Sequence, residues 1–334
     1  MYRRKSAGQM SAAESVDALA AELLAGSERA LSRSLTYIER GGPSAEALLE
    51  RIYARTGRAH VVGITGGPGS GKSTLTRALA RAARQRGRTL GIIAVDPSSP
   101  FSGGAILGDR IRMTDVATDS GVFIRSLATH GAMGGLSRAA ASSIHLMDAA
   151  GKDLIFVETV GVGQDEIDVI RAAQTVIVVS VPGLGDDIQA LKAGLLEIAD
   201  IHVVNKADRE GAEKLRTDLR NMLALGPASN ASTPPILSCI AIREEGIGPL
   251  LDAIDDHMKF LKTSGEFEKR RRRILWAEIL EIAHHLVNEG TGQLKNDSSH
   301  VLERVLGREM TPHAAGRALL AKLAHSPARE VQDV

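Results

Sequence analysis

A glycine-rich segment before residue 74 carries the clearest chemical signal in the sequence. It reads Gly66-Gly-Pro-Gly-Ser-Gly-Lys-Ser73 and fits the pattern G-x-x-x-x-G-K-[ST]. The apolar segment 61–65 precedes it directly and a helical pattern follows it directly, which is the context that this motif requires. Glycines let the chain curl so that successive N–H groups face a phosphate, and a helix N-terminus adds partial positive charge. The segment therefore predicts a nucleotide-phosphate site.

The residues of this loop have separate predicted roles. Lys72 is expected to reach the β- and γ-phosphates, and Ser73 to ligate Mg²⁺. Contacts to the nucleotide are expected from Gly66, Gly67, Pro68, Gly69, Ser70, Gly71, Lys72, Ser73 and Thr74. The alternative is a glycine-rich turn that binds nothing. The intact order of strand, loop, Lys-Ser pair and helix argues against that alternative.

A second motif, Asn205-Lys-Ala-Asp208, follows a later apolar segment. Ligands bind at strand ends in doubly wound sheets, so this N-K-x-D pattern lies where a base can be read. The Asp208 carboxylate can accept hydrogen bonds from N1 and N2 of guanine, whereas adenine would leave it buried without partners, at a cost of about 1–3 kcal/mol. We therefore expect Asn205, Lys206 and Asp208 to select GTP over ATP. The alternative is a turn in which Asp208 caps the next helix.

Acidic residues end two other apolar segments and are candidates for the metal site. Glu158 ends one of them, and Gly161 follows three residues later. A carboxylate at this position can hold a Mg²⁺-bound water, while the Gly161 N–H can sense the γ-phosphate. Asp96 ends the other segment before a proline, where its alternative role is to start a turn. No glutamine directly follows Gly161, so we expect slow intrinsic hydrolysis that a partner raises.

These motifs need a sheet to bring them together, and the sequence predicts one. Seven short segments rich in Val and Ile are typical of strands buried on both faces: 60–65, 90–95, 122–127, 154–157, 176–181, 201–204 and 236–237. Helical patterns lie between them, so we expect an α/β fold with a doubly wound, mostly parallel sheet. Ser238 and Cys239 lie at the end of the last strand and are expected to offer backbone contacts to the guanine oxygen.

Helical patterns flank this α/β part at both ends. The predicted parts are an N-terminal helical extension at 1–57, a nucleotide-binding domain at 58–262 and a C-terminal helical arm at 263–334. Ser44 is expected to cap a helix of the N-terminal extension. The basic run Lys269–Arg273 is interpreted as the solvated start of a helix, with contact to an acidic partner surface as the alternative. Trp276 is expected to be a core or dimer anchor.

The composition excludes several classes of protein. With 41 Lys and Arg against 40 Asp and Glu, and 3% aromatic residues, the chain gives no reason to expect nucleic-acid binding. Its one cysteine, Cys239, excludes an internal disulfide framework and a Cys-rich zinc site. No apolar run approaches the roughly 18 residues of a membrane helix, and no apolar stretch follows the basic start at residues 1–5. We expect a cytoplasmic protein without a membrane partner, or a mitochondrial-matrix one if the source is eukaryotic.

Together these motifs resemble one family. From about Arg29 to about Leu261 the chain is similar to the MeaB-type G-protein chaperones of adenosylcobalamin-dependent acyl-CoA mutases, also known as ArgK-like proteins or LAO/AO transport ATPases. The resemblance lies in the segments 29–39, 95–100, 103–113, 158–164, 185–189, 197–200 and 205–208. The run Glu158-Thr-Val-Gly-Val-Gly-Gln164 is highly specific to this family.

The resemblance implies a homodimeric P-loop GTPase of the SIMIBI-like type. Such a protein binds GTP or GDP with Mg²⁺, gates cofactor loading and protects a radical mutase. The resemblance places Asp96, Asp109 and Glu158 in the Mg²⁺ and switch region. With Lys72 they are the expected catalytic residues, and with Ser73 they are the expected metal ligands.

The resemblance also implies surfaces that meet other proteins. Asp186, Gln189 and Lys192 are assigned to an additional switch segment that responds to nucleotide and to the mutase, and the C-terminal helices to a dimer interface. The chain departs from the family after Arg125, where prolines are usual, and around Lys192. The client therefore stays open between methylmalonyl-CoA mutase and a relative such as a 2-hydroxyisobutyryl- or isobutyryl-CoA mutase.

Three other functions remain as alternatives. A P-loop kinase or ATPase linked to transport would share the phosphate loop, but the N-K-x-D motif argues against it. Another metallocentre-assembly GTPase, delivering nickel, would need clustered Cys and His, whereas the chain has one cysteine and ten dispersed histidines. In a non-catalytic scaffold, nucleotide would only set the shape of a dimer.

Overall fold

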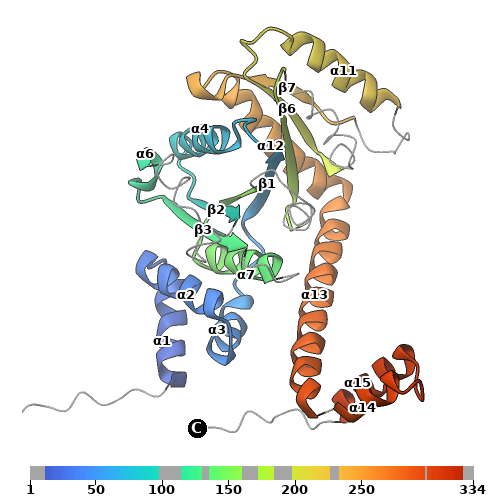
Figure 1. Cartoon of the computed structure of the whole chain (residues 1–334). Helices are drawn as coiled ribbons and strands as arrows, with labels where there is room; N and C mark the ends of the chain where they lie inside the picture. The colour runs from blue at the N-terminus through green and yellow to red at the C-terminus, as the bar shows by residue number, and fades with distance from the viewer. Residues whose placement is uncertain are drawn as a thin grey trace, which may run out of the picture. The chain divides into compact units, whose positions relative to one another are not determined.

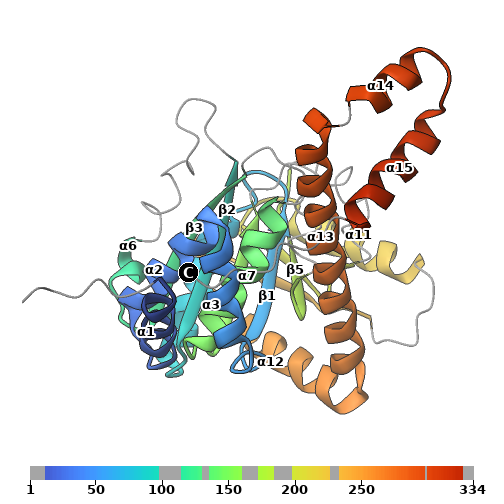
Figure 2. The ribbon, with the colours of Figure 1, turned by 90° about the horizontal axis from the view of Figure 1, so that it is seen from below.

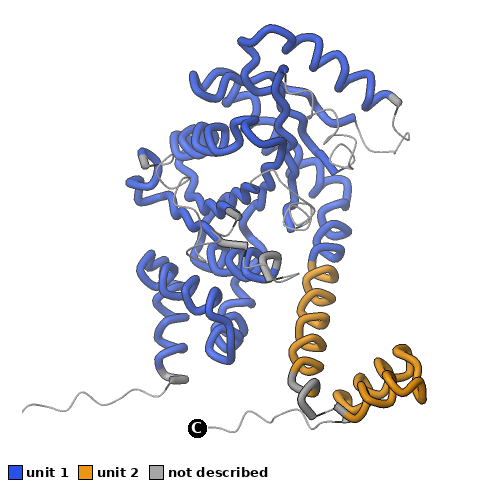
Figure 3. Tube along the Cα trace, in the orientation of Figure 1, with its two compact units in different colours: residues 1–274 blue, residues 275–334 orange. Residues whose placement is uncertain are grey.

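The computed structural model describes residues 12–97, 114–129, 135–159, 172–183, 198–225, 233–297 and 299–325. The chain (Figure 1) divides into two compact units, residues 1–274 and residues 275–334, which Figure 3 shows in different colours. The division falls inside one long helix, α13 (Glu266–Asp297). The three-part division expected at residues 57 and 262 stays a prediction.

A single parallel sheet forms the centre of the first unit. Its strands in the described residues are β1 (His60–Gly66), β2 (Leu90–Pro97), β3 (Val122–Thr129), β4 (Leu154–Thr159), β5 (Thr175–Ser180), β6 (Ile201–Asn205) and β7 (Ile236–Cys239). Their order across the sheet is β3-β2-β4-β1-β5-β6-β7, and every pair of neighbours is parallel. All seven predicted strands are present, which confirms the α/β fold.

Helices cover both faces of this sheet (Figures 1 and 2). Those of the first unit, apart from α13, are α1 (Ala12–Leu24), α2 (Glu28–Arg40), α3 (Pro43–Tyr53), α4 (Lys72–Gln85), α6 (Thr114–Ala117), α7 (Gly135–Ala149), α11 (Ala212–Leu225) and α12 (Ile247–Ser264), with a 3-10 turn η2 (Ala241–Arg243). Helices α4 and α12 pack together on one face, and α7 lies on the other with α1, α2 and α3.

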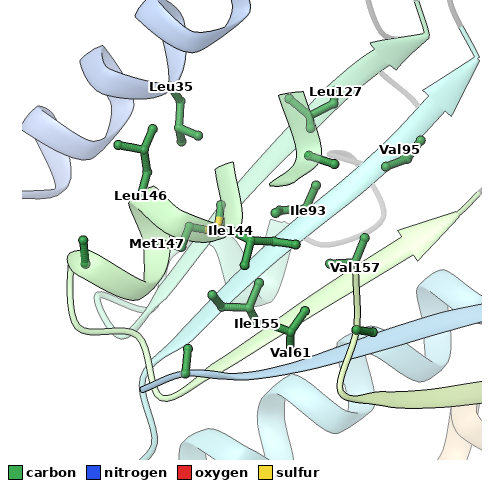
Figure 4. Close-up of a cluster of buried hydrophobic side chains, with 14 of the residues drawn as sticks. Leu35, Val61, Ile93, Val95, Leu127, Ile144, Leu146, Met147, Ile155 and Val157 are labelled. Atoms are coloured by element: carbon green, nitrogen blue, oxygen red, sulfur yellow. The ribbon is translucent and has the colours of Figure 1, made fainter. Parts of the chain in front are cut away.

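Two apolar cores result from this layering. Successive side chains of a strand point to opposite faces, so in β4 Ile155 packs in one core and Phe156 in the other. Figure 4 shows the first core, where Ile93, Ile155 and Val157 of the strands meet Met147 of α7. Because both faces are covered, the strands are apolar throughout, which is why the sequence has little polar alternation.

The N-terminal helices belong to the first of these cores. Leu23 and Leu35 are fully buried there with Ile52. The expected cap at Ser44 is wrong, because helix α3 begins at Pro43 and Gly42 is its N-cap, with φ +88°. Proline lacks the N–H that a first helical turn leaves unbonded, and its fixed φ suits that position, so the helix and its cap lie two residues earlier than expected.

The second unit consists of the later part of α13 with α14 (Ser299–Leu306) and α15 (Pro312–His325). Its described residues include large apolar side chains that are exposed: Trp276, Ile279, Leu280, Ile282, Leu286, Val287, Leu302, Leu306 and Leu320. Trp276, at 62% exposure, is therefore not a core anchor within this chain. In the described part of the chain, no helix combines the length and the apolar character needed to cross a bilayer.

The order of the strands determines where a ligand can bind. From β1 the chain passes to β2 and β3 on one side of the sheet, and later to β5, β6 and β7 on the other. Sheets of this kind usually bind their ligands at such a reversal, beyond the carboxyl ends of the strands. The predicted motifs at the ends of β1, β4, β6 and β7 all lie at this edge.

Candidate functional site

The phosphate loop is the predicted phosphate-binding motif, residues 66–73. It connects β1 to α4 and depends on glycine at two positions. A Cβ on Gly66 (φ +147°) would lie 2.1 Å from the carbonyl oxygen of Val179 in β5, and one on Gly71 (φ +88°) would lie 2.5 Å from Nδ2 of Asn205. Gly71 is the N-cap of α4, which begins at Lys72 as predicted. The loop therefore packs closely against β5 and β6, and it ends at the N-terminus of α4, which favours a bound anion.

Lys72 is the first residue of α4, and its side chain folds back into the phosphate loop. Its residue is 6% exposed, and its ammonium donates hydrogen bonds to the carbonyl oxygens of Gly66 (2.6 Å) and Gly67 (3.1 Å). The side chain thus curls back over the strand-to-helix turn. A cation held at this point is placed to meet a phosphate oxygen that enters the loop.

Ser73 and Glu158 come together behind the loop. The Ser73 hydroxyl donates a 2.5 Å hydrogen bond to Oε1 of Glu158, which is 4% exposed at the end of β4. The next residue, Thr159, donates to Thr65 Oγ1 of β1 at 3.2 Å. A hydroxyl and a carboxylate side by side are the hard oxygen ligands that Mg²⁺ takes alongside substrate phosphates. The donor set therefore fits a magnesium ion.

The Asn205-Lys206 pair joins the loop to the predicted base site. Buried Asn205 donates from Nδ2 to the Ser70 carbonyl oxygen (2.8 Å) and accepts at Oδ1 from the Ala241 N–H (3.1 Å). Lys206, with φ +55°, donates to the Gly69 carbonyl oxygen at 2.7 Å. Two consecutive residues thus brace the phosphate loop from the end of β6.

Asp208 lies beyond this brace with its side chain 37% exposed. One carboxylate oxygen is 3.6 Å from the Arg243 guanidinium. Helix α11 begins four residues later at Ala212, and the Leu215 N–H donates to the Gly211 carbonyl oxygen in its first turn. Asp208 therefore is not the residue that caps this helix, and its carboxylate faces the segment after β7.

Ser238 and Cys239 are the last two residues of β7, directly before that segment. Ser238 is exposed, whereas the Cys239 side chain is buried, and burial raises the pKa of its thiol to about 11. The Cys239 carbonyl oxygen accepts from the Ala207 N–H at 3.1 Å, and its thiol donates to the Gly246 carbonyl oxygen at 3.4 Å. The bond from Ala207 holds the end of β7 against the 205–208 turn, and the bond to Gly246 links Cys239 to the residue before α12.

Several predicted site residues lie outside the described residues: Asp109, Gly161, Asp186, Gln189 and Lys192. The backbone of Asp96 ends β2, in register with Ala128 of β3, but its side chain lies outside them as well. Their roles remain predictions. Glu158 is the predicted acid that the structure brings to Ser73.

A second polar cluster, at the opposite edge of the sheet, was not predicted. Asp200 receives two hydrogen bonds from the Arg270 guanidinium (2.6 and 2.9 Å), and His257 Nε2 lies 3.3 Å from Asp200. His257 Nδ1 lies 2.8 Å from Thr175 Oγ1, which lies 2.7 Å from His60 Nε2. Arg270 belongs to the basic run 269–273 that is predicted to be solvated. Its side chain is instead 20% exposed and paired with Asp200, so the prediction fits only the other residues of the run.

Comparison with known proteins relates this chain to a family of GTPases. A family model described as methylmalonyl Co-A mutase-associated GTPase MeaB matches residues 31–294. A Pyrococcus horikoshii protein is 45% identical over 311 residues, which are 92% of this chain and 98% of that protein. The GTPase ArgK of Escherichia coli is 37% identical over 257 residues, covering 74% of this chain and 77% of that protein.

A solved structure extends the similarity to the fold. The crystal structure of a LAO/AO transport system kinase matches with a TM-score of 0.70 at 26% identity, over 97% of this chain and 100% of that one. The family match spans the phosphate loop, Glu158 and the 205–208 turn, so it covers every described element of the candidate site. This chain belongs to the MeaB family of methylmalonyl-CoA mutase-associated GTPases.

Proposed function

We propose that this GTPase uses Mg²⁺ and the state of its nucleotide to gate the loading of adenosylcobalamin into an acyl-CoA mutase, and to protect that mutase. The observation that carries the GTP site is the bracing of the phosphate loop by Asn205 and Lys206. The brace joins the phosphate loop to the turn that carries Asp208. The family relationship supports the link to a mutase.

The residues of the site have separate roles in nucleotide binding and hydrolysis. The loop N–H groups and Lys72 hold the triphosphate and offset the charge that builds up on its oxygens. Ser73 and Glu158 would hold Mg²⁺, which when bound neutralises phosphate charge. Asp208 accepts hydrogen bonds from the N1–H and N2–H groups of guanine, and Ser238 and Cys239 offer backbone contacts to the guanine oxygen.

Changing Asp208 to Asn tests the base site. The amide offers one acceptor and one donor where guanine presents two donors, so one N–H of guanine faces another N–H. We expect the ratio of GDP to ADP affinity to fall at least about tenfold, because an unmatched buried donor costs about 1–3 kcal/mol. Calorimetric titration of both nucleotides measures it. An unchanged ratio would show that another group reads the base.

The mutase link has its own test. We expect purified adenosylcobalamin-dependent methylmalonyl-CoA mutase to accelerate GTP hydrolysis by this protein, measured as phosphate release. The proposed switch residues for this response are Asp186, Gln189 and Lys192, with Asp96, Asp109 and Gly161 near the γ-phosphate. Unchanged phosphate release with this and related mutases would count against a chaperone. Transfer of phosphate to a protein or metabolite instead of water would favour the kinase alternative.

We also propose that the second unit forms a homodimer interface. Its exposed apolar side chains, Trp276 and Leu286 among them, are the kind of surface that association with a second copy buries. Sedimentation equilibrium of the full chain, with and without GTP, measures the mass. The mass of a single chain in both conditions would contradict this assignment.

A further inference from the structure

Arg243 faces the carboxylate that we assign to guanine recognition. Its Nη2 lies 3.6 Å from Oδ2 of Asp208, at the end of the 3-10 turn η2. Both side chains are partly exposed, 59% for Arg243 and 37% for Asp208, so the pair is weak by itself. The arginine belongs to none of the motifs of the sequence.

The turn that carries Arg243 is anchored on either side of it. Two residues earlier, the Ala241 N–H donates to Asn205 Oδ1 at 3.1 Å. One residue later, Glu244 adopts φ +59° and accepts a 2.7 Å hydrogen bond from Arg81 of α4. The turn is thus tied to both β6 and the helix behind the phosphate loop, and Arg243 projects from a fixed backbone.

Arg243 and a guanine base can use the same carboxylate together. A carboxylate has two oxygens and about four lone-pair sites. Guanine takes one site on each oxygen through its N1 and N2 protons, which leaves sites for a guanidinium. A bound base also removes water from Asp208, and a charge that loses water becomes costlier unless an opposite charge stays beside it.

We propose that Arg243 is a positioning residue for guanine recognition. It keeps the Asp208 carboxylate turned toward the base and compensates its charge once the base covers it. The inference rests on the proposed reading of guanine by Asp208. It predicts that Arg243 contributes to the binding of guanine nucleotides only through Asp208.

The test is a double-mutant cycle with GDP, measured by calorimetric titration. We expect Arg243→Ala to raise the dissociation constant about three- to fivefold, the upper range for an exposed ion pair. The effect should shrink at high salt, because exposed charges are screened. In an Asp208→Asn background, the same change should leave the dissociation constant unaltered, since the carboxylate is gone.

Arg209→Ala is the matched control. Arg209 is exposed, directly follows Asp208 and carries the same charge, so its removal changes the net charge equally. Equal weakening by both variants, tighter binding by Arg243→Ala, or a loss that persists with Asp208→Asn would each overturn the inference. If Asp208→Asn leaves the preference for GDP over ADP intact, the base site itself fails. If that preference falls while Arg243→Ala binds like the wild type, only the role of Arg243 fails.

Discussion

Lys72→Ala is expected to lower GTP hydrolysis at least about a hundredfold and to weaken GTP binding at least about tenfold. The ammonium lies within the phosphate loop, 2.6 Å from the Gly66 carbonyl oxygen, where it can meet the β- and γ-phosphates. Its charge is needed more as phosphate charge develops than when the nucleotide only binds, so turnover should fall further than affinity. Phosphate release and calorimetric titration measure the two effects.

Lys259→Ala serves as the control for this change. Lys259 is a surface lysine whose side chain is 74% exposed and pairs with Asp256 on the same helix, α12. Its loss removes the same charge from a position remote from the phosphate loop. Thermal unfolding of both variants shows whether the fold is intact. A Lys72→Ala protein that folds normally and still hydrolyses GTP at half the wild-type rate would refute the role of this residue.

Asp200→Ala is expected to lower the free energy of unfolding by about 3–5 kcal/mol. The carboxylate is 11% exposed and accepts hydrogen bonds from Arg270 and from the Val176 N–H at 2.8 Å. Its removal leaves a partly buried guanidinium and a backbone N–H without their partner, and such losses exceed the net value of the pair. Urea unfolding measures the change.

Asp256→Ala is the corresponding control. Its carboxylate is 70% exposed and pairs with Lys259 three residues later, so its loss should cost less than about 0.5 kcal/mol. Equal shifts of the urea midpoint in the two variants would show that the Asp200 cluster contributes no more than a surface pair. The same comparison separates a loss of buried contacts from a simple loss of negative charge.

The stability that Asp200 contributes should also depend on pH. Burial alone raises the pKa of Asp200, but hydrogen bonds from His257 and Arg270 outweigh it and lower the pKa from 3.8 to about 2. A pKa lowered by folding stabilises the protein above pH 3.8, and this part, about 2 kcal/mol, is lost as the pH falls toward 2. Asp200→Ala should therefore show a shallower loss of stability over this interval than the wild type.

The two sequence motifs of the candidate site are the part of the molecule that local sequence could predict. The loop 66–73 and the 205–208 turn were identified because backbone curling, helix starts and apolar strands depend on neighbouring residues. The same local logic misplaced one helix start, at Ser44, because the pairing of Gly42 with Pro43 took precedence. The edge where the two motifs meet followed from the general rule for doubly wound sheets.

Hydrogen bonds from side chains to partners far away in the chain could not be predicted from local sequence. The Asn205 side chain reaches Ser70 across 135 positions, and Asp200 reaches Arg270 across 70. Neither pairing has a sequence signal: the two motifs do not show that Asn205 bonds to Ser70, and a partly buried arginine in a basic run looks like its solvated neighbours. Arg243 beside Asp208 is a further example.

The sequence by itself therefore determined the fold class, and it indicated the phosphate-loop motif and the candidate residues for base recognition, because these depend on short-range geometry and on a periodic apolar pattern. Only the tertiary structure decided which side chains hold them in place. Helix packing and strand register set the distances between segments remote in the chain, and a hydrogen bond or ion pair forms only when those distances fall within a few ångströms.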